Sequence, residues 1–223
     1  MLYKLLRCFV LAFAIVGVYF TVEIVVTPLF AVHGVSGSAW FINQNGQIVT
    51  AYHVVNHNSH FFISYKGKLI RATVIGVDKY NDIAILSTSL KSTSYLPLEA
   101  DYKDGEQAQL LGYPVPDTMG YNLKNKPAIL HKSWANKGEL DYTGISCHGN
   151  SGGPVVGETG VVGTITHGIT GSNPFSKCSN NGYGPTTAEI IILGKKLGID
   201  MYSTSMVDLH HITNSEVVII YAY

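Results

Sequence analysis

The sequence of 223 residues is poor in charge: Asp, Glu, Lys and Arg make up 13% of it, about half the usual share, and the formal net charge is zero. A nucleic-acid-binding chain normally carries a basic excess, so this balance argues against that class. Three cysteines are too few to build a disulfide-stabilised miniprotein. The sequence also lacks runs of like charge, low-complexity tracts and repeats of about 20–50 residues.

Hydrophobic residues, in contrast, make up 46% of the chain, which argues against disorder. A chain of this length can bury a sizeable core without metals or many disulfides. At about 150 residues per domain, it forms one domain or two small ones. Composition therefore predicts a compact globular protein but indicates no function.

The N-terminal segment has the layout of an export signal. Lys4 and Arg7 precede an uncharged run from Cys8 to Val22, which Glu23 interrupts. Two charges followed by 15 largely apolar residues are typical of a secretory signal peptide. As a helix, such a run reaches only about 22 Å, short of the roughly 30 Å hydrocarbon core, and a longer anchor would place Glu23 in or near lipid.

A cleaved signal peptide and an uncleaved membrane anchor therefore both remain open for residues 1–33. A buried core helix is disfavoured, because no polar face recurs at the helical period. Either export interpretation places the rest of the chain in the periplasm or outside the cell, where disulfides can form.

From Ser36 onward, short β-rich runs alternate with Gly, Asn and Asp, which is typical of an all-β barrel or sandwich. Asn45-Gly46 is a hairpin turn signal. The expected strands are Ser38–Ile42, Ile48–Thr50, Phe61–Tyr65, Leu69–Val77, Ile83–Leu86, Ala108–Gly112, Ala128–His131, Pro154–Gly157 and Val161–Thr166.

The remaining segments have weaker patterns. Residues 91–103 are poor in strand pattern and are expected to link two halves. Thr187 is expected to cap a helix from about Ala188 to Leu197. A last apolar run, Val217–Tyr223, has no partner that the sequence identifies.

Three segments carry the residue types of nucleophilic catalysis. The first leads to His53, the second begins with Asn81-Asp82, and the third reads Gly-Asn-Ser-Gly-Gly-Pro around Ser151. Each places a reactive side chain at a strand end or in a glycine-rich turn. In chain order they supply a base, a carboxylate and a nucleophile.

A serine hydroxyl is a weak nucleophile at neutral pH and needs an adjacent base, which itself needs a group to hold its tautomer. His53 can be the base, Asp82 the holding group and Ser151 the nucleophile. The glycines permit a tight turn in which the N–H groups of Gly149 and Ser151 form an oxyanion hole. Each piece alone has an ordinary structural explanation, but their joint occurrence in this order favours catalysis.

The remaining histidines give no further site. His53, His57 and His60 are disfavoured as a metal cluster, because the i, i+4 spacing of the first two suits a zincin helix but no Glu lies between them. We therefore predict no metal and no cofactor. No role is assigned to His33, His131, His148, His210 and His211.

Together the motifs resemble the chymotrypsin-fold (trypsin-like) serine proteases, closest to the HtrA/DegP type and other short trypsin-like members. The matching family segments are Gly-Ser-Gly-Phe … Leu-Thr-Asn-x-His-Val-Val, Asp-Leu-Ala-Val-Leu and Gly-Asn-Ser-Gly-Gly-Pro, and the resemblance covers about Gly37–Leu197. It implies an all-β fold of two antiparallel six-stranded β-barrels with a short C-terminal helix. It also implies a triad of His53, Asp82 and Ser151 in the cleft between the barrels.

On this basis we expect a protease domain at 34–198, with half-barrels at about 36–95 and 104–187 and a tail at 199–223. The implied activity is that of a serine endopeptidase acting on protein or peptide substrates, with possible membrane anchoring and no nucleic-acid partner. Asn150 stands where members activated by cleavage carry an Asp, so we expect no such zymogen switch. We also expect no PDZ-like extension.

The resemblance further implies a disulfide between Cys147 and Cys178 that braces the specificity pocket. It would close a loop of about 32 residues, worth about 3–4 kcal/mol in the chain-entropy model. A Cys147-His148 nucleophile pair is disfavoured, because neighbours on a strand point to opposite faces.

The specificity pocket is expected from residues 143–146 and 166–168. The expected substrate-binding residues are Ile145, Ser146, Thr166, His167 and Gly168. Ile145 stands where trypsins carry their pocket-floor Asp, so an apolar P1 residue is expected, and carboxylate recognition by Ser146 and His167 ranks lower. The segment Thr166–Gly168 can also pair with substrate backbone as an edge strand.

Two other functions remain open. One is a catalytically silent protease-fold binding module, against which the presence of all three triad residue types argues. The other is a self-processing protease of the polyprotein type, which the small barrels would fit.

Overall fold

The computed structural model describes residues 35–91, 93–115, 121–133, 136–169, 177–202 and 207–223. The strands are β1 (Val35–Phe41), β2 (Gln47–Ala51), β3 (Phe61–Tyr65), β4 (Lys68–Asp78), β5 (Ile83–Thr88), β6 (Gln107–Gly112), β7 (Lys124–Lys132), β8 (Glu139–Cys147), β9 (Pro154–Val156), β10 (Val161–Thr164), β11 (His167–Ile169), β12 (Cys178–Pro185) and β13 (Val217–Ala222). The helices are α2 (Tyr52–Val55) and α4 (Thr187–Lys196). The expected export segment, 1–33, lies outside these ranges, within which no helix has the length and apolar character to cross a membrane.

Every strand expected from the sequence is present, with ends that differ by a few residues. The structure adds β8, β11 and β12, whose mixture of Gly, Asn, Ser and Thr hides the alternation of a strand. Thr187 is the first residue of α4 rather than its cap, which is Thr186, and the Thr187 hydroxyl donates to the carbonyl of Val161 at 2.6 Å. This bond attaches the helix to β10.

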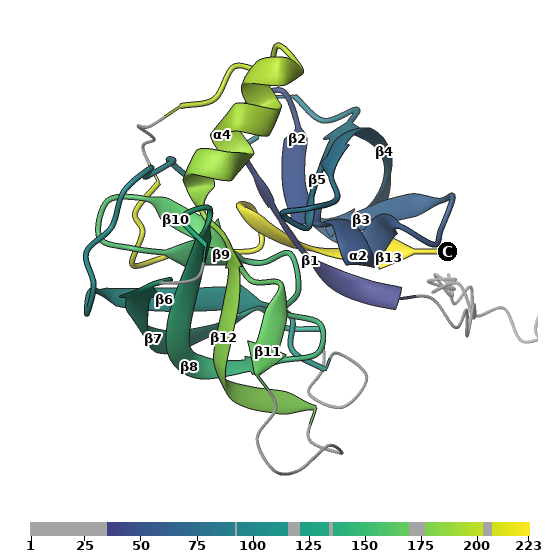
Figure 1. Ribbon diagram of the computed structural model, residues 1–223. Coiled ribbons are helices and arrows are strands. Elements are labelled where there is room, and N and C mark those ends of the chain that lie inside the picture. Colours follow the sequence, from purple (N-terminus) through teal and green to yellow (C-terminus); the bar gives the residue numbers. More distant parts are fainter. Residues whose placement is uncertain (1–34, 92, 116–120, 134–135, 170–176, 203–206) are drawn as a thin grey trace, which may run out of the picture. The chain divides into compact units, whose positions relative to one another are not determined.

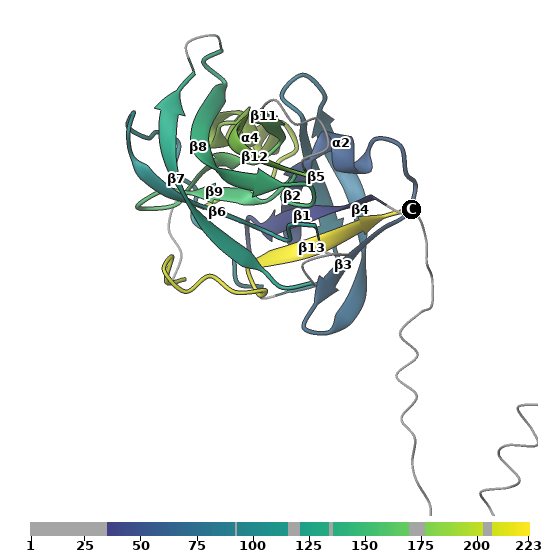
Figure 2. The same ribbon diagram turned by 90° about the horizontal axis from the view of Figure 1, so that it is seen from below.

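The C-terminal strand β13 closes the first barrel, whose order is β1-β13-β3-β4-β5-β2. β13 runs antiparallel to both β1 and β3, and Figures 1 and 2 show it in yellow along the purple β1. The sixth strand of this barrel therefore comes from the far end of the sequence and not from residues 36–95. The partners that the sequence left open for Val217–Tyr223 are β1 and β3.

β13 is apolar along its length because both of its faces are buried. Val218 and Ile220 pack inside the first barrel. Val217 and Ile219 instead belong to the apolar core that the first barrel shares with the second sheet. A strand that alternates between two apolar environments has no polar face to reveal its orientation.

The second sheet has the order β10-β9-β6-β7-β8-β12-β11. It is a half-barrel sheet of seven strands rather than the expected six-stranded barrel, and β11 forms a further edge beside β12. The all-β class, the two β units and the C-terminal helix are as the resemblance implied.

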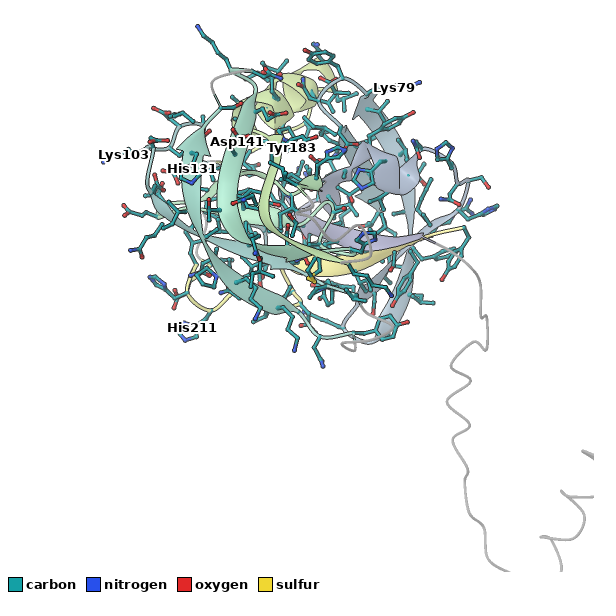
Figure 3. All side chains as sticks on the ribbon, turned by 60° about the horizontal axis from the view of Figure 1, so that its bottom comes forward. Lys79, Lys103, His131, Asp141, Tyr183 and His211 are labelled. Atoms are coloured by element: carbon teal, nitrogen blue, oxygen red, sulfur yellow. A yellow bond between two sulfur atoms is a disulfide. The ribbon has the colours of Figure 1, made fainter. Side chains whose placement is uncertain are left out.

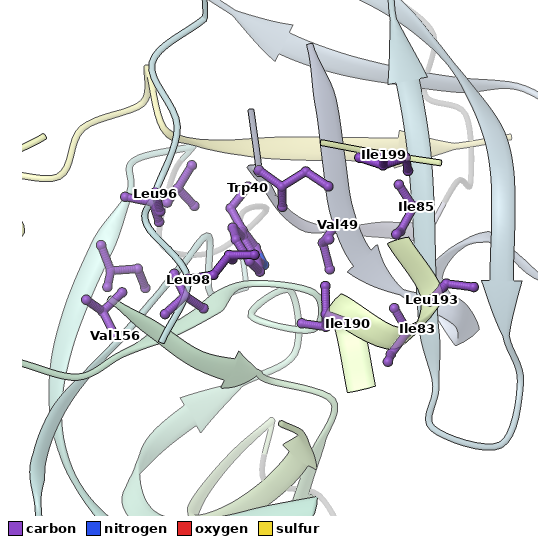
Figure 4. Packing of buried hydrophobic residues seen from close by; sticks show 14 of the residues in the cluster. Trp40, Val49, Ile83, Ile85, Leu96, Leu98, Val156, Ile190, Leu193 and Ile199 are labelled. Atoms are coloured by element: carbon purple, nitrogen blue, oxygen red, sulfur yellow. The ribbon is translucent and has the colours of Figure 1, made fainter. Parts of the chain in front are cut away.

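A shared core joins the first barrel, the second sheet and α4 (Figure 4). Trp40 of β1 is fully buried in it, and Ile190 and Leu193 of α4 pack against it. The strands that carry the site are consequently held by apolar contacts from both sides. Burial of such side chains contributes about 1.5–3 kcal/mol each to folding.

Truncation of a buried β13 residue should destabilise the fold. Ile220 is fully buried inside the first barrel, so Ile220→Ala should lower the free energy of unfolding by about 2–5 kcal/mol through lost burial and a residual cavity. Urea unfolding measures this difference. Ile192→Ala, at a side chain 45% exposed on α4, is the matched control and should cost about 0.5 kcal/mol or less. Equal effects of both substitutions would contradict the placement of β13.

Candidate active site

Two neighbouring strands of the first barrel bring His53 and Asp82 together. β2 runs directly into α2, which holds His53, and Asp82 directly precedes β5. β2 pairs antiparallel with β5, and Ala51 lies opposite Ile83, so both residues lie at the same end of the pair. The N–H of Tyr52 donates to the carbonyl of Asp82 at 3.0 Å and extends this pairing.

Asp82 holds His53 at two points. Its Oδ1 accepts the backbone N–H of His53 at 2.8 Å, and its Oδ2 lies 2.7 Å from the ring Nδ1. The Asp82 side chain is 15% exposed and that of His53 is 39% exposed. Because a carboxylate only accepts hydrogen bonds, Nδ1 carries the proton and Nε2 is free to accept one.

The turn before β5 fixes the position of the Asp82 carboxylate. Asp82 has a φ of 55°, in the left-handed region that Asp tolerates. The carboxylate of Asp78 accepts the backbone N–H groups of Tyr80 and Asn81. The amide of Asn81 donates to Asp78 and, at 3.2 Å, to Glu189 of α4. The helix therefore braces the turn that presents Asp82.

Ser151 lies in the turn between β8 and β9, and Ser38 of β1 anchors this turn. The N–H of Ser38 donates to the carbonyl of Ser151 at 2.8 Å, and its buried hydroxyl donates to the carbonyl of Gly149 at 2.7 Å. The same hydroxyl accepts the N–H of Tyr113 at 2.9 Å. One residue of the first barrel thus fixes the turn from Gly149 to Ser151.

Gly152 allows this close approach because it has no side chain. Its φ is +86°, and a Cβ at this position would lie 2.2 Å from the carbonyl oxygen of Ser38 and 2.2 Å from Oγ1 of Thr50. Thr50 is buried and donates to the same Ser38 carbonyl at 2.8 Å. The glycine after Ser151 is therefore required for contact between the turn and β1.

The N–H groups of Gly149 and Ser151 are unpaired within the described part of the chain. Their neighbours are paired, since Asn150 N–H donates to the carbonyl of Cys147 at 3.0 Å and Gly153 N–H to that of Asn150 at 2.8 Å. Gly149 and Ser151 both line the same cleft, which has a volume of about 360 Å³. Two free donors in one tight turn can bind a negatively charged oxygen.

The Ser151 hydroxyl donates to the carbonyl of Thr166 at 3.4 Å, and no hydrogen bond joins it to His53 among the described residues. Both side chains line the cleft. Rotation about χ1 redirects a serine Oγ without backbone movement, and catalytic hydrogen bonds are often long in ligand-free sites. In the cleft, the hydrogen bond between His53 and Asp82 is therefore formed, whereas the one between Ser151 and His53 is not.

Of the expected specificity residues, Ser146, Thr166, His167 and Gly168 line the cleft, and Ile145 does not. Ile145 is 50% exposed, whereas Ser146 is 4% exposed. They are neighbours on β8, where successive side chains point to opposite faces of the sheet. Ser146, not Ile145, is the inward-facing residue, which corrects the expected pocket floor.

Sequence reasoning missed Ser179 and Tyr142. Ser179 lies opposite Ser146 across β12 and β8 and lines the cleft. Tyr142 is 1% exposed, and its hydroxyl donates to Oγ of Ser146 at 3.0 Å. The disulfide gives a register from which Ser179 could have been identified, because it follows Cys178 as Ser146 precedes Cys147. Tyr142 has no such signal.

The disulfide between Cys147 and Cys178 is present, which confirms the pairing that the resemblance implied. It joins the end of β8 to the start of β12 beside the cleft. Next to it, the N–H of His148 donates to the carbonyl of Lys177 at 2.8 Å. Both of these residues line the cleft, although the sequence assigned no role to His148.

His167, at the start of β11, lies beside the Asp82 carboxylate. Its Nδ1 is 3.9 Å from Oδ2 of Asp82 and 3.0 Å from Oγ1 of Thr166. Its ring centroid lies 5.7 Å from that of His53. Oδ2 of Asp82 therefore lies near a ring nitrogen of two histidines, an arrangement that no sequence spacing indicated.

Tyr183 of β12 packs against the His167 ring. The two rings are stacked, with centroids 5.0 Å apart and planes 9° apart. Burial raises the pKa of Tyr183, and the negative charges of Glu139, Asp82 and Asp141 raise it further. Figure 3 labels Tyr183 and Asp141, which lie opposite each other on β12 and β8.

Comparisons with known proteins find similar sequences. The model of the trypsin-like peptidase domain family matches residues 37–163. The uncharacterised protein y4bJ of Sinorhizobium fredii is 29% identical over 141 residues, which cover 59% of this chain and 22% of y4bJ. The mitochondrial serine protease HTRA2 of Drosophila erecta is 28% identical over 154 residues, which cover 63% of this chain and 36% of the relative.

The fold is also similar to that of solved structures. The serine endoprotease from Yersinia pestis superposes with a TM-score of 0.59 at 23% identity, over 72% of this chain and 57% of that structure. At 23% sequence identity, this similarity supports a common fold and not a common function. The chain spans about a fifth to a third of the length of the two curated relatives.

The buried phenol of Tyr142, which is bonded to Ser146 of the cleft, should make stability fall at alkaline pH. Burial raises the pKa of Tyr142 to about 12, above the value of about 10 for an exposed tyrosine. The folded state therefore keeps this proton longer than the unfolded state, and stability falls as pH rises from about 10 to about 12. In urea unfolding at about pH 8 and about pH 11, Tyr142→Phe should show a smaller decline than the parent.

The matched control is Tyr80→Phe, at a side chain that is 86% exposed, and it should keep the decline of the parent chain. At about pH 8, Tyr142→Phe should cost about 1 kcal/mol for the lost hydrogen bond. An unchanged alkaline decline in Tyr142→Phe would refute the link between this phenol and stability.

Proposed function

The chain belongs to the family of trypsin-like peptidase domains, and on that premise we propose that it is a serine endopeptidase that cleaves protein or peptide substrates through an acyl-enzyme. The observation that carries the proposal is the double contact of Asp82 with His53 at the cleft that also holds Ser151. In this proposal His53 is the base, Asp82 orients it and Ser151 is the nucleophile.

The reaction follows from the tautomer that Asp82 selects. Nε2 of His53 takes the proton of the Ser151 hydroxyl as Oγ attacks the peptide carbonyl carbon. The N–H groups of Gly149 and Ser151 stabilise the oxyanion that forms. Collapse of this intermediate breaks the C–N bond, and His53 gives its proton to the leaving amine. Water then hydrolyses the ester, with His53 again acting first as base and then as acid.

Backbone recognition is proposed for β11, the edge strand of the second sheet. All three of its residues are exposed, and one side of the strand pairs with β12. An extended peptide can pair with the other side and add a strand to the sheet. His167 and Gly168 would then contact the substrate main chain.

For the P1 position, we infer a small side chain, apolar or hydroxylated. A Cβ on Gly168 would lie 2.8 Å from Cβ of Ser179 and 3.8 Å from Oγ of Ser146, so the pocket between these residues is narrow. None of the described residues that line the cleft is Asp or Glu, and the Asp82 carboxylate at its border is bonded to His53, so no free carboxylate would pair with Lys or Arg. The apolar preference expected from Ile145 loses that support, since Ile145 is outside the cleft.

Export is proposed from the N-terminal charge and hydrophobicity pattern, with either cleavage or anchoring of residues 1–33. The disulfide between Cys147 and Cys178 supports a destination outside the cytoplasm, where such bonds persist. Intact cells with this chain at their surface, or a periplasmic extract, should contain its activity. Retention of all activity in the cytoplasm would contradict export.

Labelling of the full chain with a fluorophosphonate probe tests the nucleophile. The probe should modify Ser151, and Ser151→Ala should abolish both labelling and peptide cleavage while the unfolding midpoint stays near that of the parent. Asp82→Asn should lower kcat by about 10⁴-fold, because the amide no longer fixes the productive His53 tautomer. Asn214→Asp, an exposed change away from the cleft, is the control and should retain activity.

A folded chain that is neither labelled nor active would contradict the proposal and favour the silent binding module. Cleavage confined to the chain itself, abolished by Ser151→Ala, would instead favour the self-processing protease. Mass spectrometry of the expressed chain distinguishes these outcomes.

A peptide-library digest tests the pocket. Cleavage should follow Ala, Val, Ser or Thr more often than bulky or charged residues, because the gap between Gly168 and Ser179 is narrow. Sites identified by mass spectrometry give the P1 distribution. A majority of cleavages after Phe, Lys or Arg would contradict the inferred pocket.

A further inference from the structure

Three side chains at the cleft form a group of the kind that binds metal ions. One ligand atom each from His53, Asp82 and His167 lies within 4.8 Å of the other two. The side chains come from α2, the turn before β5, and β11, so both sheets contribute. None of the three is fully buried, and His167 is 49% exposed.

The donor types and spacing suit a zinc-like cation. Two imidazole nitrogens and one carboxylate oxygen are common ligands of Zn²⁺, at about 2.0–2.2 Å from the ion. Ligand atoms in such a tetrahedral site lie about 3.4 Å apart. Here Oδ2 of Asp82 is 2.7 Å from Nδ1 of His53 and 3.9 Å from Nδ1 of His167, so small side-chain shifts reach this spacing.

We propose that His53, Asp82 and His167 bind a divalent transition-metal ion such as Zn²⁺, and that the ion reversibly inhibits the enzyme. The binding claim stands on the donor geometry, whereas the inhibition claim rests on the proposed function. The fourth coordination position would face the cleft and hold water.

Inhibition follows from the nitrogen that the ion occupies. A metal on Nδ1 of His53 leaves the single ring proton on Nε2. That nitrogen then cannot accept the proton of Ser151, so the nucleophile is not activated. The ion also takes the Asp82 oxygen that otherwise holds the active tautomer.

His167 is held in place for this role by its neighbours. Its ring stacks on Tyr183, which limits rotation away from Asp82. Its contact with Oγ1 of Thr166 would be given up on metal binding, but that hydroxyl still has the carbonyl of Tyr183 as an acceptor at 3.2 Å. The cost of binding is therefore one hydrogen bond at His167 and one at His53.

The proposal departs from the expectation of no metal, for which only His53, His57 and His60 were weighed as ligands. His57 and His60 are both exposed, and neither joins the group around Asp82. The ring of His60 contacts the hydroxyl of Ser59 at 2.9 Å. The three-residue group instead depends on His167, which lies 114 positions after His53 and reaches it only through the fold.

Calorimetric titration of Zn²⁺ into the full chain tests the site directly. The parent for this titration is Ser151→Ala, which prevents self-cleavage and removes none of the three ligands. His167→Gln in this background should weaken Zn²⁺ binding at least about tenfold. The matched control, His57→Gln, removes an exposed histidine outside the group and should leave the affinity unchanged.

His167→Phe is the second variant, because it keeps the ring stacked on Tyr183 while removing both nitrogens. It should match His167→Gln in zinc affinity and keep the unfolding midpoint of the parent. If both His167 variants bind Zn²⁺ as tightly as the parent, the site is not the one proposed.

The rate of fluorophosphonate labelling tests the inhibition in the chain with Ser151 intact. Zn²⁺ should slow labelling, and a chelator should restore it. Each variant is compared with its own rate without metal, and His167→Gln should need at least about tenfold more Zn²⁺ for half-inhibition. Equal sensitivity of the two chains would overturn the inhibitory role. Absence of labelling without metal would refute the proposed function, whereas the calorimetric result would still decide the site.

Discussion

The hydrogen bonds of Ser38 are the constraint on which the site depends. Through its N–H and hydroxyl, this one residue of β1 fixes the carbonyls of Ser151 and Gly149 in the turn of the other sheet. β1 is itself held between β2 and β13, so the C-terminal strand of the chain supports the position of the nucleophile. Ser38 thus links the first barrel to residues of the second sheet and its turns.

Asp82 has a corresponding role within the first barrel. Its carboxylate and carbonyl bind three groups of residues 52–53, and the turn that carries it is braced from α4 by Glu189. The same carboxylate lies beside His167 on the second sheet. Catalysis, as proposed, needs Oδ2 of Asp82 to hold the proton on Nδ1 of His53, whereas the proposed metal ion would bind both of these atoms. The two states therefore exclude each other.

Short sequence motifs predicted the parts of the site that depend on neighbouring residues alone. The sequences around His53, Asp82 and Ser151 identified the three side chains that line or border the cleft, because strand ends and glycine-rich turns present them. The partner of β13 could not be predicted, since a strand buried on both faces carries no directional pattern. The prediction that Ile145 forms the pocket floor was wrong by one residue, because the inward-facing position was taken from the family's pattern rather than from the alternation of side chains along β8. The pairing of His167 with Asp82 exists only in three dimensions.

A crystal structure of the full chain after reaction with a fluorophosphonate tests whether the turn anchored by Ser38 presents the nucleophile and its oxyanion hole. We expect phosphorus bonded to Oγ of Ser151, with the phosphonyl oxygen within hydrogen-bond distance of the N–H groups of Gly149 and Ser151. We also expect Nδ1 of His53 to remain bonded to Asp82. Phosphorus on another residue, or a phosphonyl oxygen turned away from both N–H groups, would refute these roles of the turn.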